Sequence, residues 1–247
     1  MRSLEELQMN AYPSLQTTLY DGWVLRFADG YGNRANSVNP IYKSLEGVQE
    51  KIDKCEMVFR SKNLKPTFKI TPFIYPENLD ELLENRGYII MHPTSIQISS
   101  LSNILEPSIS SIITTNELDD QWFDNCCNFF NTSMENRKIH KKILNNLIPQ
   151  KFYTSLLVKD EVVACGMGVL ENGYVGIFDV VVSEKHRNNG YGAQLLINIL
   201  KVAKAHGAKN AYLQVMINNL PAVHLYNKLG FREEYQYFYR VLLDKNT

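Results

Sequence analysis

Two closely spaced glycines between an apolar strand and a long helix constrain this chain more than any other feature. Val180, Val181 and Val182 end the strand pattern, and helical apolar spacing resumes at Leu195. Between them lies Arg187-Asn188-Asn189-Gly190-Tyr191-Gly192-Ala193. The first N–H groups of a helix have no internal partner and carry the positive end of its dipole. The stretch therefore predicts a backbone cradle for a pyrophosphate or a similar anion.

Other glycine motifs fit this stretch less well. A dinucleotide fingerprint needs a third glycine and a ribose-binding acid, and a P-loop needs Lys-Ser/Thr after its last glycine. Neither pattern follows Gly192. An ordinary turn between strand and helix remains the alternative interpretation, because Asn-Asn-Gly also suits such a turn.

Length, charge and cysteines narrow the class of protein. A chain of 247 residues exceeds the usual size of one domain, so one large or two modest domains are expected. With 26 basic and 26 acidic residues, the chain has no overall field that would recruit nucleic acid or an anionic membrane. The cysteines form no Cys-x-x-Cys pair, so no disulfide framework and no metal site are expected. Without an apolar run of membrane-spanning or signal-peptide length, the expected location is cytoplasmic.

Hydrophobic periodicity divides the chain into two halves around the polar, serine-rich residues 103–111. The first half predicts a helix, a hairpin, a helix, a strand, a helix and an extended segment, at residues 4–9, 22–39, 45–63, 66–71, 76–85 and 88–98. The second half predicts a strand, two helices, three strands, a helix, a strand, a helix and a strand over residues 112–243. Both halves end on a helix followed by Gly and an aromatic residue, which suggests an internal repeat.

A second motif, Asn219-Leu220-Pro221-Ala222-Val223-His224-Leu225-Tyr226-Asn227-Lys228-Leu229-Gly230-Phe231, follows the glycine stretch by about thirty residues. The two stretches together resemble the Arg/Gln-x-x-Gly-x-Gly/Ala and Asn-x-x-Ala-x-x-Leu-Tyr-x-x-x-Gly-Phe signatures of the GNAT superfamily of N-acetyltransferases. The resemblance covers roughly residues 112–243. It implies an α/β (α+β) GNAT fold, with a central mixed, mostly antiparallel sheet flanked by helices.

The internal repeat then suggests two GNAT-like halves in tandem. Residues 108–247 are expected to form a catalytic GNAT domain, and residues 1–107 a degenerate GNAT-like domain. The first half lacks paired glycines before its long helix, and Leu83 stands where Tyr226 stands in the second half. The first half is therefore not expected to bind an acyl-CoA.

The resemblance also implies acetyl-CoA as cosubstrate and no metal. The strand at 174–182 would part from the next strand, so that the pantetheine arm pairs with the backbone beside Val180, Val181 and Val182. The amides from Arg187 to Ala193 would hold the pyrophosphate, Arg187 would add a charged contact, and Asn219 would bond the pantetheine arm.

Tyr226 and Asp179 are the candidate catalytic residues. In direct attack of a primary amine on the thioester, Tyr226 matches the family's general acid toward the leaving thiolate, and a phenol with a pKa near 10 is a competent donor. Packing on the sheet is the alternative role for Tyr226. Strand alternation places Asp179 on the same face as Ile177 and Val181. Asp179 has three interpretations: the general base, an acceptor for the amine, or a structural ion-pair partner.

Two other classes of function stay open at this level. A non-catalytic acyl-CoA sensor would keep the cradle without turnover, and an interaction module would bind no CoA. The sequence leaves open the acceptor, the length of the acyl donor, the general base and the oligomeric state.

Overall fold

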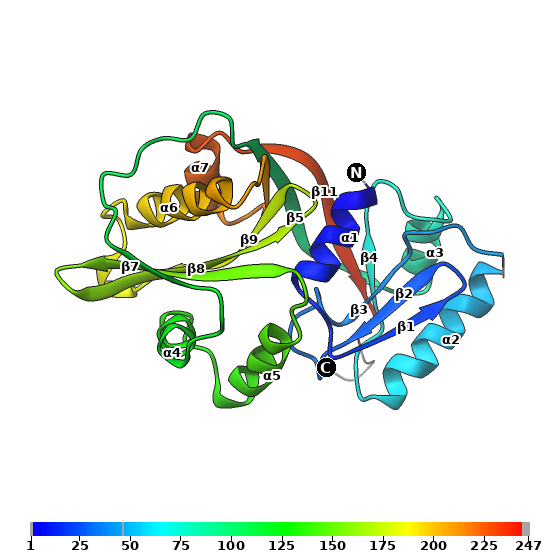
Figure 1. The fold of residues 1–247 in the computed structure, drawn as a ribbon. Helices are drawn as coiled ribbons and strands as arrows, with labels where there is room; N and C mark the ends of the chain where they lie inside the picture. Colours follow the sequence, from blue (N-terminus) through cyan, green and yellow to red (C-terminus); the bar gives the residue numbers. More distant parts are fainter. Residues whose placement is uncertain (1, 46, 244–247) are drawn as a thin grey trace. The chain divides into compact units, whose positions relative to one another are not determined.

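The computed structural model describes residues 2–45 and 47–243. The chain divides into two compact units, the first formed by Met1–Ser95 with Tyr235–Thr247 and the second by Ile96–Glu234. Figure 1 shows the elements. In chain order they are α1 (Arg2–Ala11), β1 (Gln16–Tyr20), β2 (Trp23–Phe27), β3 (Ser37–Asn39), α2 (Val48–Ser61), β4 (Thr67–Ile70), α3 (Leu79–Asn85), β5 (Ile89–Ser100), β6 (Ile112–Thr115), α4 (Asp120–Phe129), α5 (Met134–Asn145), β7 (Gln150–Val158), β8 (Glu161–Glu171), β9 (Tyr174–Val182), the short 3-10 turn η1 (Glu184–His186), α6 (Tyr191–Ala205), β10 (Asn210–Met216), α7 (Leu220–Lys228) and β11 (Arg232–Val241).

The first unit is built on strands in the order β1-β2-β3-β4-β11. β2 pairs antiparallel with β1 and β3, β3 pairs parallel with β4, and β11 pairs antiparallel with β4. Trp23, Phe59, Phe68 and Leu83 are fully buried where α2 and α3 pack on the sheet. The predicted hairpin of β2 and β3 is confirmed. β1 was not predicted, because its side chains are almost all exposed and carry no apolar alternation.

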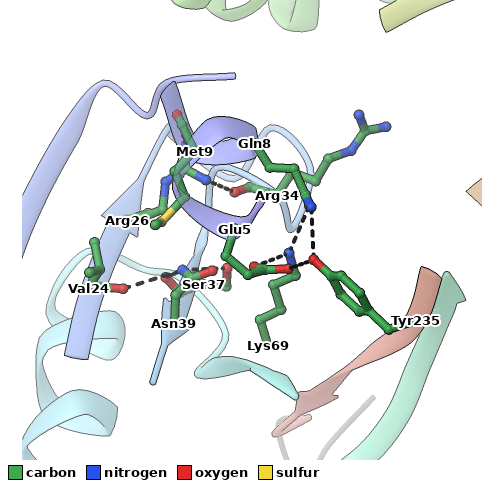
Figure 2. A network of polar contacts seen from close by, with 10 residues as sticks. All are labelled: Glu5, Gln8, Met9, Val24, Arg26, Arg34, Ser37, Asn39, Lys69 and Tyr235. Atoms are coloured by element: carbon green, nitrogen blue, oxygen red, sulfur yellow. Dashed lines mark hydrogen bonds and ion pairs between the residues drawn. The ribbon is translucent and has the colours of Figure 1, made fainter. Parts of the chain in front are cut away.

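Helix α1 is fixed to the other face of this sheet by a buried polar network (Figure 2). Lys69 Nζ lies 2.6 Å from Glu5 Oε2 and donates to Gln8 Oε1 at 3.3 Å. Tyr235 Oη donates to Glu5 Oε1 at 2.5 Å and accepts from Gln8 Nε2 at 3.0 Å. Because Lys69 alternates with the core residues Phe68 and Ile70 along β4, the network lies opposite α2 and α3.

The second unit has the strand order β5-β10-β9-β8-β7-β6. The sheet is mixed: β6, β7, β8 and β9 are antiparallel neighbours, and β9 pairs parallel with β10. Helices α6 and α7 cover one face and α4 and α5 the other (Figure 1). The main core lies under α6, where Leu195, Leu196 and Ile199 pack on the buried side chains of β8 and β9. This is the fold class that the sequence predicts.

The division between the units differs from the boundary expected at residues 107 and 108. The chain passes from the first unit to the second within β5, and it returns to the first within β11. The polar residues 103–111 belong to the second unit, where the side chain of Gln194 accepts from the amides of Ser108 and Ile109 at 2.8 and 3.0 Å. Side-chain anchoring of this kind gives no periodic signal in a sequence.

Candidate active site

A bulge interrupts β9 at the predicted catalytic carboxylate. The β8–β9 register pairs Met167 with Phe178 and Cys165 with Val181, so Asp179 and Val180 both lie opposite Gly166. Asp179 has a φ of +52°, in the left-handed region that residues other than glycine seldom adopt. Such an extra residue bends a strand and redirects the side chains that follow.

The bulge corrects one expectation from the sequence. Simple alternation places Asp179 on the face of Ile177, but Ile177 belongs to the core under α6, whereas Asp179 contacts α5. Past the bulge, Val180 and Val182 pack against the core under α6. A bulge shifts the period of two by one residue, and no local sequence pattern marks its position here.

The ladder between β9 and β10 ends where the acyl donor is expected. It pairs Asn210–Tyr212 with Tyr174–Gly176. Among the described residues the pairing stops there, although β9 continues to Val182 and β10 to Met216. Strand backbone that is unpaired inside a sheet can hydrogen-bond an extended ligand as if the ligand were a strand. The predicted separation of the two strands beside Val180, Val181 and Val182 is present in the structure.

The glycine stretch opens α6 as predicted. Asn188 and Gly190 both have positive φ, +64° and +79°, and Gly190 is the N-cap of α6 without a side-chain hydrogen bond to the helix. Asn189 Nδ2 donates to Arg187 O at 3.0 Å and braces the turn. A Cβ on Gly192 would lie 3.3 Å from Leu225, so this glycine lets α6 pack closely on α7.

Several backbone amides at the start of α6 lack an acceptor within residues 2–45 and 47–243. Among the described residues, none accepts a hydrogen bond from the amides of residues 188–192. The predicted cradle is shorter than expected at both ends, because the Arg187 amide donates to Glu184 O and the Ala193 amide to Gly190 O. The exposed Arg187 side chain reaches back toward Val182 O, 3.5 Å from its Nε.

Helix α7 carries the other predicted residues. Asn219 caps α7, with its Oδ1 accepting from the Ala222 amide at 3.4 Å, a structural role that the sequence reasoning did not assign. Tyr226 is half-buried and contacts the Phe231 ring edge to face at 6.1 Å. Its ring also packs against the core under α6, so the aromatic packing considered as an alternative is present beside the predicted catalytic position.

Asp179 forms an ion pair with His140, a residue to which the sequence analysis assigned no role. His140 Nε2 lies 3.0 Å from Asp179 Oδ2, and the His140 side chain is only 4% exposed. Burial opposes protonation of His140, but the charge and hydrogen bond of Asp179, together with Cys127, raise its pKa to about 9. The pair is therefore an imidazolium and a carboxylate at neutral pH. Its members are 39 positions apart, so no motif connects them.

The neighbouring cysteines are buried and not activated. Cys126 Sγ lies 3.9 Å from Asp179 O. Burial raises the pKa of Cys126 well above its ordinary value and that of Cys165 to about 12. Thiols with such pKa values stay protonated at neutral pH and are poor nucleophiles.

In the first unit, polar side chains and backbone groups bond one another near the start of α2 and the end of β3. The Asp21 carboxylate accepts from the Leu45 amide at 3.0 Å, just before α2, and pairs at 3.0 Å with the fully buried Lys51 ammonium. At the end of β3, the Tyr75 amide donates to Pro40 O at 3.1 Å, and Trp23 Nε1 donates to Tyr75 O at 3.0 Å.

Comparison with known proteins gives the family. A family model described as "Probable histone acetyltransferase Rv0428c C-terminal" matches residues 1–240. The chain is a member of the GNAT superfamily. The uncharacterized N-acetyltransferase YobR of Bacillus subtilis (strain 168) is 29% identical over 245 residues, which is 98% of this chain and 98% of YobR. The GNAT signatures at Gly190 and Tyr226 thus lie in a chain related to acetyltransferases over nearly its whole length.

Solved GNAT structures share the fold of the whole chain. A GCN5-related N-acetyltransferase from Kribbella flavida aligns with a TM-score of 0.74 at 12% identity, over 100% of this chain and 96% of that chain. A tandem GNAT protein from the clavulanic acid biosynthesis pathway, solved without AcCoA, aligns with a TM-score of 0.64 at 11% identity, over 98% and 87%. The second match agrees with two GNAT-like halves in tandem.

The described part of the chain provides neither a metal-binding cluster nor a membrane-spanning helix. Residues 2–45 and 47–243 contain no cluster of three or more His, Cys, Asp or Glu side chains able to hold a metal ion. In the same residues, no helix has both the length and the apolarity needed to span a bilayer.

Proposed function

We propose that the second unit of this GNAT acetyltransferase transfers an acetyl group from acetyl-CoA to a primary amine by direct attack. The observation that carries the proposal is made on residues 2–45 and 47–243: the β9–β10 ladder stops at Gly176, and no acceptor faces the amides of residues 188–192. Both features lie at the carboxyl end of β9, which leads through η1 into α6. One extended ligand with a strand-like arm and a diphosphate fits both, and acetyl-CoA has this form.

The residues present suit this cosubstrate. The amides of residues 188–192 would hold the pyrophosphate with the dipole of the 15-residue helix α6, and Arg187 adds a mobile positive charge. The backbone beside Val180, Val181 and Val182 would pair with the pantetheine arm. Asn219 uses Oδ1 as a helix cap, so its Nδ2 is the atom left to donate to that arm.

The proposed chemistry needs a proton donor and a proton acceptor. The amine nitrogen bonds to the thioester carbonyl carbon, the carbon–sulfur bond breaks, and the sulfur takes a proton from the Tyr226 phenol. The ammonium form of the acceptor first loses one proton to water, so that a neutral amine attacks; the nitrogen loses a second proton to water as the amide forms, and the Tyr226 phenolate regains a proton from water. Because the Asp179 carboxylate already pairs with His140, we assign Asp179 chiefly to attracting the ammonium form of the acceptor.

Calorimetric titration of the full chain with CoA tests the proposal directly. We expect saturable binding at one site per chain, because the first unit lacks paired glycines before its long helix α2. A panel of primary amines is then assayed for acetyl-CoA-dependent thiol release. Absence of CoA binding would refute the proposal, and binding without release for any amine would favour an acyl-CoA sensor.

The variant Gly190→Glu tests the binding of the diphosphate at the start of α6 separately from the folding of the chain. A Cβ at Gly190 meets nothing within 4 Å, so the added carboxylate should stand in the cradle and repel a diphosphate. We expect CoA binding to be lost in calorimetry. Gly207→Glu is the matched control, because Gly207 lies just after the same helix with φ +90° and equally open space. Unchanged CoA affinity in Gly190→Glu would contradict the cradle assignment.

A further inference from the structure

The bulge at Asp179 is held by groups from the helices on the far face of the sheet. His140 on α5 bonds the Asp179 side chain, and Cys126 on α4 lies against the Asp179 carbonyl. Left-handed backbone at a residue other than glycine is unfavourable and persists where the surroundings determine it. Here those surroundings are two buried side chains, His140 at 3% and Cys126 at 0% exposure.

His140 itself has little freedom to move. Its ring lies 5.8 Å from the Phe123 ring, between α4 and α5, and its neighbours Ile139 and Ile143 are buried. Its Nε2 is therefore fixed in position, and it holds the Asp179 carboxylate at a distance of 3.0 Å. A rigid helix residue is thus connected through one hydrogen bond to the strand segment that borders the proposed slot.

The bulge and the slot are coupled through the backbone of β9. Before the bulge, β9 pairs with β10 as far as Gly176, and past the bulge the valines pack under α6. If the bulge relaxed, β9 would regain a regular period of two and could continue the ladder with residues 213–216 of β10. Closing the ladder would remove the backbone groups that the pantetheine arm needs.

We propose that His140 is a positioning residue for the acyl-donor slot: by holding Asp179, it fixes the bulge that keeps β9 separate from β10. The inference rests on the proposed function, because it assigns His140 a role in forming that same site. His140 touches neither the donor nor the acceptor in this proposal and acts only through Asp179.

Three variants at one position test the role of the hydrogen bond. His140→Leu removes the hydrogen bond. His140→Gln places an amide donor near the position of Nε2, whereas the shorter side chain in His140→Asn cannot reach Asp179. We expect CoA affinity to fall at least about tenfold in the Leu and Asn variants, equivalent to roughly 1.4 kcal/mol, and to stay within about threefold in the Gln variant. If the Leu variant does not fold, the comparison of Gln with Asn carries the test.

A control distinguishes positioning from stability. Ile143→Ala, on the same helix, removes a fully buried side chain without touching Asp179. At a temperature where all variants are folded, we expect Ile143→Ala to bind CoA like the unaltered chain despite a lower Tm. If His140→Leu also bound CoA normally, the ion pair would be structural only and the inference would be overturned.

Hydrogen exchange of the unliganded protein gives a second measurement. A general loss of stability would make amide exchange faster, whereas the proposed closure of the ladder would make it slower. In His140→Leu, amide exchange at Leu213, Val215 and Met216 should slow at those positions that a continued ladder with β9 would engage. Faster or unchanged exchange there would count against the inference. If the unaltered chain failed to bind CoA, the proposed function would be wrong. If the unaltered chain bound CoA and the His140 variants bound it as well as Ile143→Ala does, only the inference about His140 would be wrong.

Discussion

Tyr226 and His140 show that the chemistry of a residue depends on contacts that its sequence neighbours do not supply. Tyr226 was found by its place in a motif, and the structure adds that its ring packs on Phe231. His140 belongs to no motif, and its role follows from one contact with Asp179.

The variant Tyr226→Phe separates catalysis from packing. The ring and its contact with Phe231 remain, and only the hydroxyl is lost. We expect CoA affinity to be unchanged and kcat to fall by about 10²–10⁴, the usual contribution of a general acid. Tyr174→Phe, at the start of β9, serves as the control and should leave kcat unchanged. An unaltered kcat in Tyr226→Phe would leave Tyr226 a packing residue.

His140 also makes the stability of the chain depend on pH. Its pKa rises from 6.5 in the unfolded chain to about 9 in the folded one, so the folded state binds the proton more tightly. The stabilisation is complete below pH 6.5 and is lost as pH rises through 9, with a total on the order of 3 kcal/mol. Urea unfolding from pH 6 to pH 10 should show this loss in the unaltered chain. A difference profile against His140→Gln that is flat across this range would contradict the assignment.

At the scale of elements, α1 is attached to its sheet by a closed polar network rather than by apolar packing alone. Glu5 and Lys69 are almost completely buried, and each hydrogen-bonds further members of the network (Figure 2). Burial of the Tyr235 hydroxyl and the nearby Glu5 charge raise the Tyr235 pKa, so the phenol remains a hydrogen-bond donor. A satisfied network of this kind fixes the position of a helix, but the loss of one member leaves another charge buried alone.

Glu5→Gln tests this network. The substitution leaves the Lys69 ammonium buried without a counter-charge, and we expect the free energy of unfolding to fall by about 3–5 kcal/mol. Chemical denaturation followed by circular dichroism measures the change. Glu6→Gln, at the exposed neighbouring position, should cost less than about 1 kcal/mol. The double variant Glu5→Leu with Lys69→Met should recover stability relative to Glu5→Gln, and failure to recover it would mean that the charges themselves are not the cause.

At the scale of the whole molecule, the two GNAT-like halves are not two consecutive segments. β5 and β11 each contribute residues to both units, and the family model likewise spans residues 1–240 as one match. In the second unit, β10 has β5 as its neighbour, and the buried Leu101 that follows β5 bonds Lys209 O through its amide at 2.8 Å. Neither half therefore completes its sheet from its own contiguous residues.

Fragments cut at the boundary expected from the sequence should not fold alone. Residues 108–247 would lack β5 and Leu101, and residues 1–107 would lack β11. We expect each purified fragment to lack the dispersed amide spectrum of a folded domain, because an open sheet edge exposes core residues and unpaired backbone. Mixing or co-expressing the two fragments should restore structure and CoA binding. A well-dispersed spectrum from residues 108–247 alone would disprove this prediction.

The sequence by itself predicted most of the order of the elements, the fold class and the glycine turn that opens α6. Periodic apolar patterns depend on local geometry, so β9, α6 and α7 lie close to where the patterns predict them. Gly190 and Gly192 were identified for the same reason, since the start of a helix is a local event. The exposed β1 and the anchored residues 103–111 lack such a pattern and were not recognised.

Only the tertiary structure decided the bulge at Asp179, its partner His140 and the membership of β5 and β11 in both units. Each depends on pairing between residues that are far apart in the chain. A carboxylate in a strand pattern looks the same whether or not a histidine 39 residues earlier bonds it. Contacts with those distant residues stabilise an unfavourable φ and select which strands pair. A local sequence pattern does not indicate which distant residues will make these contacts.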